Sequence, residues 1–375
     1  MNQNAMETKP FYKDYIESIT PYEPGRPMEE VENDFGFGRV IKLASNENPL
    51  GPSRKALRAM RKALKRAHLY PDGSSRELKE RLAHEFDLPP SQFVIGNGSN
   101  EIIELIARGF LEKGDKVISS ETSFLVYPLI AQTCGAEYVS VPMKDFRFDL
   151  KGILGRIDER TRIIFIANPN NPTGTYVSRE EVEDFLSKVP KDVIVVFDEA
   201  YIDFVEAKDF PYLLFQVKAN KPNIILLRTF SKSYGLAGLR IGYGLASREM
   251  VQYLEKVRQP FNVNRIAQAG ALAALDDRLF LWRSKRLVCR GRQYVYRKLN
   301  KLGLSFVASE ANFVLIDVKR DAKKVFEAML KHGVIVRAMT AYGLPQHIRV
   351  TIGTRFDLMR FIHVLKLVLK GDNKS

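Results

Sequence analysis

Cysteine and long apolar runs are scarce in this chain. Its 375 residues include two cysteines, Cys134 and Cys289, which give no disulfide framework. We find no apolar stretch long enough to cross a bilayer. Residues 1–15, MNQNAMETKPFYKDY, are polar and lack the apolar segment of a secretory signal. Together these absences predict a protein of the reducing cytoplasm.

Acidic residues are outnumbered, with 44 Asp and Glu against 58 Lys and Arg, for a formal charge of +14. This balance suits nucleic acid, an anionic membrane or anionic small molecules as partners. No zinc-finger or RNA-binding signature is present. The densest basic cluster, residues 54–68, has the spacing of one amphipathic helix. We therefore interpret the charge as a source of solubility and of steering for phosphorylated substrates.

Short apolar runs alternate with helical patterns between about residues 92 and 246, which predicts a mainly parallel sheet covered by helices. The expected strands are residues 93–95, 116–119, 138–141, 163–166, 193–197, 224–227 and 241–245. Ligands of such sheets bind beyond the carboxyl ends of the strands.

The pattern changes after about residue 268 and predicts a smaller α+β domain. A long helical region at 266–302 precedes short strands at 305–308, 313–317, 334–337 and 348–351. The fold class is therefore α/β, with a large seven-stranded domain and a smaller α+β domain. We place the N-terminal arm, as part of the small domain, at 1–45, the large domain at 46–265 and the C-terminal small domain at 266–375.

The most informative segment is RTFSKSYGLAGLRIGY, residues 228–243. It follows the buried strand at 224–227 and holds Ser231 and Lys232 in a turn of small residues, with Arg240 further on. A lysine at the end of a buried strand loses its proton more readily, and its neutral amine can form a Schiff base with an aldehyde. Ser231 and Arg240 could bind an accompanying phosphate. Pyridoxal phosphate combines both groups, although Lys232 taken alone would be read as a surface charge.

Two other strand ends supply parts of the same site. The strand at 93–95 leads into GNGSNE, where Gly98 and Ser99 at a helix N-terminus can bind a phosphate; an ordinary strand-to-helix turn explains the motif as well. The strand at 193–197 ends in DEAY, so Asp198 could pair with a protonated pyridine nitrogen, and Tyr201 could donate to the cofactor phenolate. Capping of the next helix is the alternative role for Asp198.

Three further residues have both a functional and an ordinary explanation. Asn171, in the turn ANPNNPTG, could also bond the phenolate oxygen, while the prolines and glycine explain a rigid turn. Phe124 is a candidate for stacking on a pyridine ring or for the core. Arg349, in HIRVTIG, can hold a carboxylate or phosphate through two hydrogen bonds, against a surface ion pair as the default.

In combination, these segments resemble the fold-type I pyridoxal-phosphate aminotransferases, and among them the histidinol-phosphate aminotransferase family, from about residue 19 to 369. The motifs that carry the resemblance are ITPYEPG (19–25), KLASNENPLGPS (42–53), LYPDGS (69–74), GNGSNEIIE (96–104), ANPNNPTG (167–174), DEAYIDF (198–204), RTFSKSYGLAGLRIGY (228–243) and IRVTIGT (348–354). Two departures stand out: SSETS precedes Phe124 where a proline is common, and Asn100 occupies a position that is often acidic.

The resemblance implies a role for each matching position. Lys232 would carry the cofactor, Asp198 would pair with its pyridine nitrogen, Tyr201 and Asn171 with its phenolate oxygen, and Phe124 would stack on its ring. The phosphate would be held by Gly98, Ser99, Thr229, Ser231 and Arg240. The substrate would be met by Tyr22, Asn171, Arg337 and Arg349. Tyr70 would reach the phosphate of the neighbouring subunit's cofactor, so the expected active unit is a homodimer, and no metal is expected.

The implied activity is ping-pong transamination between L-histidinol phosphate and 2-oxoglutarate, or between imidazole-acetol phosphate and glutamate in the reverse sense, in histidine biosynthesis. Lys232 would act as general base, and one arginine site could bind both the phosphate ester and the α-carboxylate. The first alternative is an aromatic amino-acid aminotransferase. Less favoured are a threonine-phosphate decarboxylase and a non-catalytic binder of anions or nucleic acid.

Overall fold

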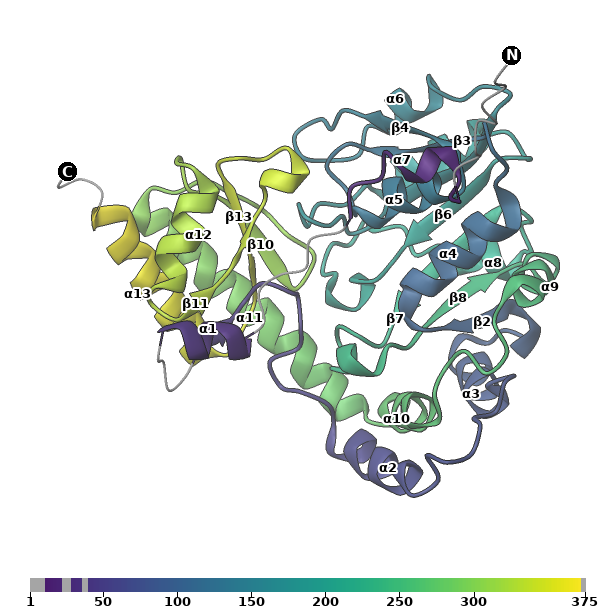
Figure 1. The fold of residues 1–375 in the computed structure, drawn as a ribbon, viewed down its shortest axis with the longest axis horizontal. Helices are drawn as coiled ribbons and strands as arrows, with labels where there is room; N and C mark the ends of the chain where they lie inside the picture. The colour runs from purple at the N-terminus through teal and green to yellow at the C-terminus, as the bar shows by residue number, and fades with distance from the viewer. Residues whose placement is uncertain (1–10, 22–27, 36–39, 372–375) are drawn as a thin grey trace, which may run out of the picture.

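The computed structural model describes residues 11–21, 28–35 and 40–371, so Tyr22 lies outside the described residues. Figure 1 shows two parts side by side, a larger one around a seven-stranded sheet and a smaller one with its own sheet. Helix α11 (Arg278–Leu302) runs from one part to the other. Within those ranges, no helix is both long and apolar enough to cross a membrane.

The larger sheet has the strand order β2-β8-β7-β6-β5-β3-β4. Neighbouring strands are parallel except at β8, which is antiparallel to both β2 and β7. The mainly parallel seven-stranded sheet is therefore confirmed. Its strands are β2 (Phe93–Gly96), β3 (Lys116–Ser120), β4 (Glu137–Val141), β5 (Thr161–Ala167), β6 (Ile194–Asp198), β7 (Ile224–Thr229) and β8 (Gly242–Ala246).

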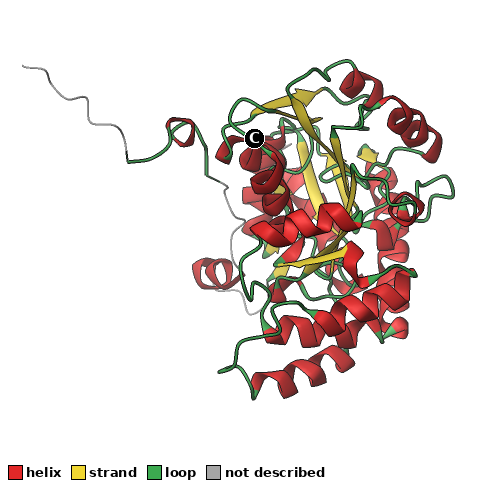
Figure 2. Cartoon of the chain, turned by 90° about the vertical axis from the view of Figure 1, so that its right-hand side faces the viewer, coloured by secondary structure: helices red, strands yellow, loops and turns green. Residues whose placement is uncertain are grey.

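Central strands of this sheet are apolar along most of their length because helices cover the sheet (Figure 2). In β5, Ile163, Ile164, Phe165 and Ile166 are fully buried. The helices packed in this part are α2 (Arg54–Leu64), α3 (Arg76–Phe86), α4 (Gly98–Phe110), α5 (Val126–Thr133), α6 (Leu150–Leu154), α7 (Arg179–Lys188), α8 (Leu214–Lys218), α9 (Arg248–Val257) and α10 (Arg265–Leu275).

The carboxyl ends of three adjacent parallel strands bring the predicted motifs together. Strands β5 and β6 pair so that Ala167 faces Asp198, and Asp198 in turn faces Leu227 of β7. The turn that contains Asn171 follows β5, Asp198 ends β6, and Lys232 follows β7. Sheet register therefore places residues from three distant sequence segments at one edge.

The smaller part is α+β, as expected. Its antiparallel sheet has the order β12-β13-β10-β9, and β1 pairs in parallel with β11 beside it. The predicted strand at 334–337 proves to be two strands because β11 pairs with β1 whereas β12 pairs with β13. Its elements are α1 (Met28–Phe35), β1 (Ile41–Lys42), β9 (Phe306–Val307), β10 (Phe313–Asp317), α12 (Ala322–Leu330), β11 (Val334–Ile335), β12 (Arg337–Ala338), β13 (His347–Thr351) and α13 (Arg355–Gly371).

The long helical region predicted at 266–302 is two helices, α10 and α11. The break falls at Asp276, and the Asp277 side chain caps α11 by accepting a hydrogen bond from the Phe280 N–H at 3.2 Å. Helix α10 packs on α2, and its Ala267 and Ala271 are buried in the core of the larger part. The division into domains at residue 265 stays a prediction; this packing favours a boundary at the junction of α10 and α11.

Candidate active site

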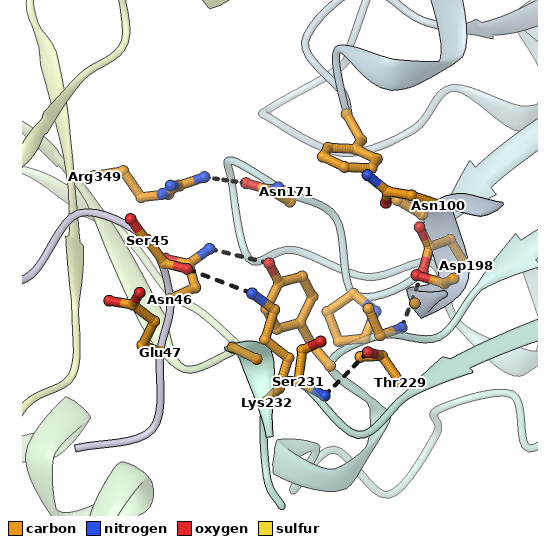
Figure 3. Close-up of a pocket in the computed structure, with 18 of the residues that line it drawn as sticks. Ser45, Asn46, Glu47, Asn100, Asn171, Asp198, Thr229, Ser231, Lys232 and Arg349 are labelled. Atoms are coloured by element: carbon orange, nitrogen blue, oxygen red, sulfur yellow. Dashed lines mark hydrogen bonds between the residues drawn. The ribbon is translucent and has the colours of Figure 1, made fainter. Parts of the chain in front are cut away.

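A cavity of about 280 Å³ lies at the carboxyl ends of β5, β6 and β7, where residues of the smaller part form one wall. Most of the predicted site residues line it. They are Gly98, Ser99, Phe124, Asn171, Asp198, Tyr201, Thr229, Ser231, Lys232, Arg240, Arg337 and Arg349. Figure 3 shows several of them directed into this space.

Lys232 follows the end of β7, and its Nζ donates to the Ser45 carbonyl at 3.4 Å (Figure 3). Burial lowers the pKa of Lys232 to about 8, and the positive charge of Arg349 acts in the same direction. A substantial fraction of this amine is therefore unprotonated, and thus nucleophilic, just above neutral pH.

Asp198 is the last residue of β6, and its carboxylate is buried with two donors. The Ala200 N–H donates to Oδ1 at 3.1 Å, and the Tyr127 hydroxyl donates to Oδ2 at 3.0 Å. Burial raises the pKa of Asp198, while the Tyr127 hydrogen bond opposes that rise. Asp198 does not cap the following short helix η3 (Ile202–Phe204), whose N-cap residue is Tyr201.

Tyr201 is held by Asn46, whose side-chain amide donates to the phenol oxygen at 3.0 Å. Asn46 is itself fixed by Thr351 of β13. The backbone N–H of Asn46 donates to the Thr351 hydroxyl at 2.9 Å, and that hydroxyl donates to the side-chain oxygen of Asn46 at 3.1 Å. Burial raises the pKa of Tyr201 to about 12. At neutral pH it is therefore a phenol with a proton to donate into the cavity.

Arg349 reaches the cavity from β13 of the smaller part. One of its terminal nitrogens donates to the Asn171 side-chain oxygen, and the other donates to the Ala44 carbonyl at 2.7 Å (Figure 3). Its Nε is buried, and within the described part of the chain it has no hydrogen-bond acceptor. Arg349 thus has donor capacity left for an anion.

Gly98, Ser231 and Arg240 line the cavity together. Gly98 begins α4 with φ +75°, and a Cβ there would lie 2.7 Å from the Arg240 Nη2. Arg240 also donates from Nη1 to the Ser231 hydroxyl at 3.4 Å. A helix N-terminus, a hydroxyl and a guanidinium therefore converge where only glycine leaves room.

Two predicted residues have roles that the cavity does not test. Tyr70 is 78% exposed and does not line the cavity; its ring stacks on Phe261 with a centroid distance of 4.8 Å. Its reach into a neighbouring subunit stays a prediction. The predicted contact of Tyr22 with substrate also stays a prediction, since that residue lies outside the described ranges.

Sequence reasoning missed Asn46 and Tyr127. Asn46 lies in the motif KLASNENPLGPS, where a run of polar residues directly after an apolar segment was a usable signal. Tyr127 lies three residues after Phe124 but is fully buried and does not line the cavity.

No metal site is found among the described residues, which contain no group of three or more His, Cys, Asp and Glu side chains placed to hold an ion.

Comparisons with known proteins identify the family of this chain. Residues 38–365 match the family model for aminotransferase class I and II. A histidinol-phosphate aminotransferase of Moorella thermoacetica is 45% identical over 368 residues, which cover 98% of this chain and 95% of the relative. One from an Anaeromyxobacter species is 46% identical, covering 96% of this chain and 99% of the relative.

A solved structure leads to the same family. The histidinol-phosphate aminotransferase from Sinorhizobium meliloti, in complex with pyridoxal-5'-phosphate, superposes with a TM-score of 0.89 at 29% identity, covering 98% of this chain and 100% of that one. The chain therefore belongs to the aminotransferase class I and II family and, within it, to the histidinol-phosphate aminotransferases.

Proposed function

We propose that this enzyme transfers an amino group between L-histidinol phosphate and 2-oxoglutarate with pyridoxal 5'-phosphate as its cofactor. One observation carries the proposal. A lysine with a lowered pKa, Lys232, shares a single cavity with a buried acid, Asp198, and with the anion-binding end formed by Gly98, Ser231 and Arg240.

The residues present fit this cofactor. Lys232 offers an amine for the aldehyde, Asp198 offers a negative charge for the ring nitrogen, and the space beside Gly98 and Arg240 suits a phosphate. When bound, the cofactor supplies an electron-withdrawing ring that stabilises negative charge at the substrate α-carbon.

Side chains of the cavity would supply proton transfer and hold the cofactor in place. Lys232 Nζ would take the proton from the substrate α-carbon, a role for which its pKa of about 8 suits it. Asp198 would hold a proton on the ring nitrogen, and the phenol of Tyr201 and the amide of Asn171 would orient the phenolate oxygen. Phe124 would pack on the ring face.

Arg349, with Arg337 beside it on the cavity wall, would bind the anionic group of both substrates. Histidinol phosphate presents a phosphate ester where glutamate presents its α-carboxylate, and a guanidinium binds either group with two hydrogen bonds. One arginine site can therefore serve both half-reactions.

The test is a transamination assay of the purified protein with histidinol phosphate, phenylalanine, tyrosine and threonine phosphate as alternative substrates. We expect the highest kcat/KM with histidinol phosphate; a clear preference for the aromatic acids would instead indicate an aromatic amino-acid aminotransferase. Release of carbon dioxide from threonine phosphate would indicate a decarboxylase.

Attachment of the cofactor is tested separately by borohydride reduction and peptide mass spectrometry. We expect the adduct on Lys232, its loss in Lys232→Ala, and its retention in the control Lys221→Ala, which changes an exposed lysine before β7. An adduct on another lysine would refute the assignment.

We also propose a cytoplasmic homodimer in which Tyr70 completes the partner's phosphate site. Leu64, Leu69, Tyr70 and Phe261 are large apolar side chains that are all between 43% and 78% exposed. Exposed apolar groups of this kind are typical of a protein interface. The two unbridged cysteines, Cys134 and Cys289, support a reducing compartment.

A further inference from the structure

Tyr127 is a fully buried residue that contacts two of the groups proposed to hold the cofactor. Its hydroxyl donates to Asp198 Oδ2 at 3.0 Å. Its ring meets that of Phe124 edge to face, with centroids 5.6 Å apart and an interplanar angle of 86°. Tyr127 itself does not line the cavity, so any effect on the reaction must act through these two neighbours.

The Tyr127 ring is held rigidly. It stacks on Phe165 of β5 at 4.6 Å and 3°, and its N–H donates to the Phe124 carbonyl at 3.1 Å, which closes the turn before α5. A buried phenol that is fixed by stacking on the central sheet has little freedom to redirect its hydroxyl. The direction of its hydrogen bond is therefore set by the fold.

The Asp198 carboxylate depends on this hydrogen bond. The only other donor recorded for its side chain among the described residues is the Ala200 N–H at 3.1 Å. The charge of Lys232 also lowers the pKa of Asp198, and the negative charge of Asp198 in turn raises the pKa values of Glu199 and Tyr201. Burial raises the pKa of Tyr127 well above that of a free phenol, so its hydroxyl keeps its proton and stays a donor.

We infer that Tyr127 is a positioning residue that fixes the Asp198 carboxylate and the Phe124 ring relative to each other, so that the acid and the stacking surface meet the cofactor ring in one geometry. The inference rests on the proposed function. The hydrogen bond from the Tyr127 hydroxyl keeps the Asp198 carboxylate ionised and directed at the ring nitrogen.

The experiment compares Tyr127→Phe with wild type and with Tyr138→Phe. The first change removes only the hydroxyl and keeps the ring that stacks on Phe165. The control removes a phenol hydroxyl from β4, where it donates to the Ser120 carbonyl at 3.3 Å and does not line the cavity. The quantities measured are the dissociation constant of pyridoxal phosphate, the ¹⁵N shift of the labelled pyridine nitrogen in the bound cofactor, the steady-state kcat and KM, and the thermal midpoint as a check on folding.

We expect Tyr127→Phe to bind the cofactor about 10- to 100-fold more weakly, since one hydrogen bond to a buried charge is lost. We also expect its nitrogen resonance to move toward the unprotonated value, and kcat to fall more than KM changes. Tyr138→Phe should retain the wild-type affinity and resonance.

Three outcomes separate the hypotheses. Wild-type protein that fails to bind pyridoxal phosphate through Lys232 would overturn the proposed function itself. If wild type binds and Asp198→Ala weakens binding, but Tyr127→Phe matches wild type in affinity and nitrogen shift, the role of Tyr127 is refuted. Equal losses in Tyr127→Phe and Tyr138→Phe, with an unchanged nitrogen shift, would reduce Tyr127 to a packing residue and refute it too.

Discussion

Arg349 and Asn171 bridge the two parts of the protein across the cavity. The guanidinium of Arg349, on β13, donates to the side-chain oxygen of Asn171, in the turn after β5. Its second terminal nitrogen donates to the Ala44 carbonyl, and Nε has no acceptor in the described part of the chain. These two bonds use two of the five N–H donors of the guanidinium, so Arg349 can donate to an anion while it still bridges the two parts.

Arg349→Lys should lower kcat/KM for both histidinol phosphate and glutamate by about 10- to 100-fold, because a lysine offers a point charge in place of two aligned donors. Steady-state kinetics with each substrate measure the effect. Arg297→Lys, on the exposed surface of α11, is the control and should leave both values unchanged. A loss confined to one substrate would show that the phosphate and the carboxylate use different sites.

The rate at which cofactor-free protein captures pyridoxal phosphate should rise with pH, with a midpoint near pH 8, and level off about one to two pH units higher. The pKa of Lys232 is lowered to about 8 by burial, and only the unprotonated amine reacts, so the reactive fraction grows as pH rises through that value. Stopped-flow absorbance measures the midpoint. Arg349→Gln removes a positive charge that lowers this pKa and should move the midpoint upward; a wild-type midpoint near 10.5 would contradict the burial argument.

Mixing two inactive variants tests the dimer. A subunit with Tyr70→Ala keeps its own Lys232, and a Lys232→Ala partner can lend it an intact Tyr70, so mixed dimers contain one complete site. With random reassortment, activity should recover to about a quarter of wild type. Unfolding and refolding the two variants together, then assaying transamination, gives the measurement. Recovery no greater than the sum of the separate variants would mean that Tyr70 acts within its own subunit or not at all.

Gly98→Ala should weaken binding of pyridoxal phosphate at least tenfold because the new Cβ, 2.7 Å from the Arg240 guanidinium, would push it from the phosphate position. Gly303→Ala is the matched control. Gly303 also has a positive φ, +67°, but nothing lies within 4 Å of the place a Cβ would take. Gly303→Ala should therefore lose about 1 kcal/mol of stability and no cofactor affinity. Equal affinities in the two variants would remove Gly98 from the phosphate site.

The site residues at strand ends could be predicted from the sequence because their motifs directly follow the apolar runs that form the strands. Asp198 directly follows the buried run 193–197, and Lys232 lies five residues after the buried run 224–227; parallel pairing then fixes which edge of the sheet they share. The same logic located Gly98 at the start of α4. Local pattern and tertiary position agree at these places, so the sequence alone was sufficient.

Asn46 and Tyr127 could not be found in this way. The role of Asn46 depends on contacts with Tyr201 and Thr351, which are 155 and 305 positions away in the chain. Tyr127 is directed at Asp198 by stacking on Phe165, and nothing local distinguishes it from an ordinary core aromatic. The break at Asp276 was missed because helical periodicity continues on both sides of it, while the packing of α10 on α2 sets a different axis.

The pairing of β1 with β11 ties the segment before Asn46 to the smaller part. The Leu43 N–H donates to the Ile335 carbonyl at 2.7 Å, and the Leu43 carbonyl accepts from the Thr351 N–H at 2.9 Å. This early segment is therefore hydrogen-bonded to strands near the other end of the sequence. If the smaller part swings as a rigid body, Ser45 and Asn46 travel with Arg349. Opening would then break the Asn46–Tyr201 and Arg349–Asn171 hydrogen bonds at the same time, and closing would restore both.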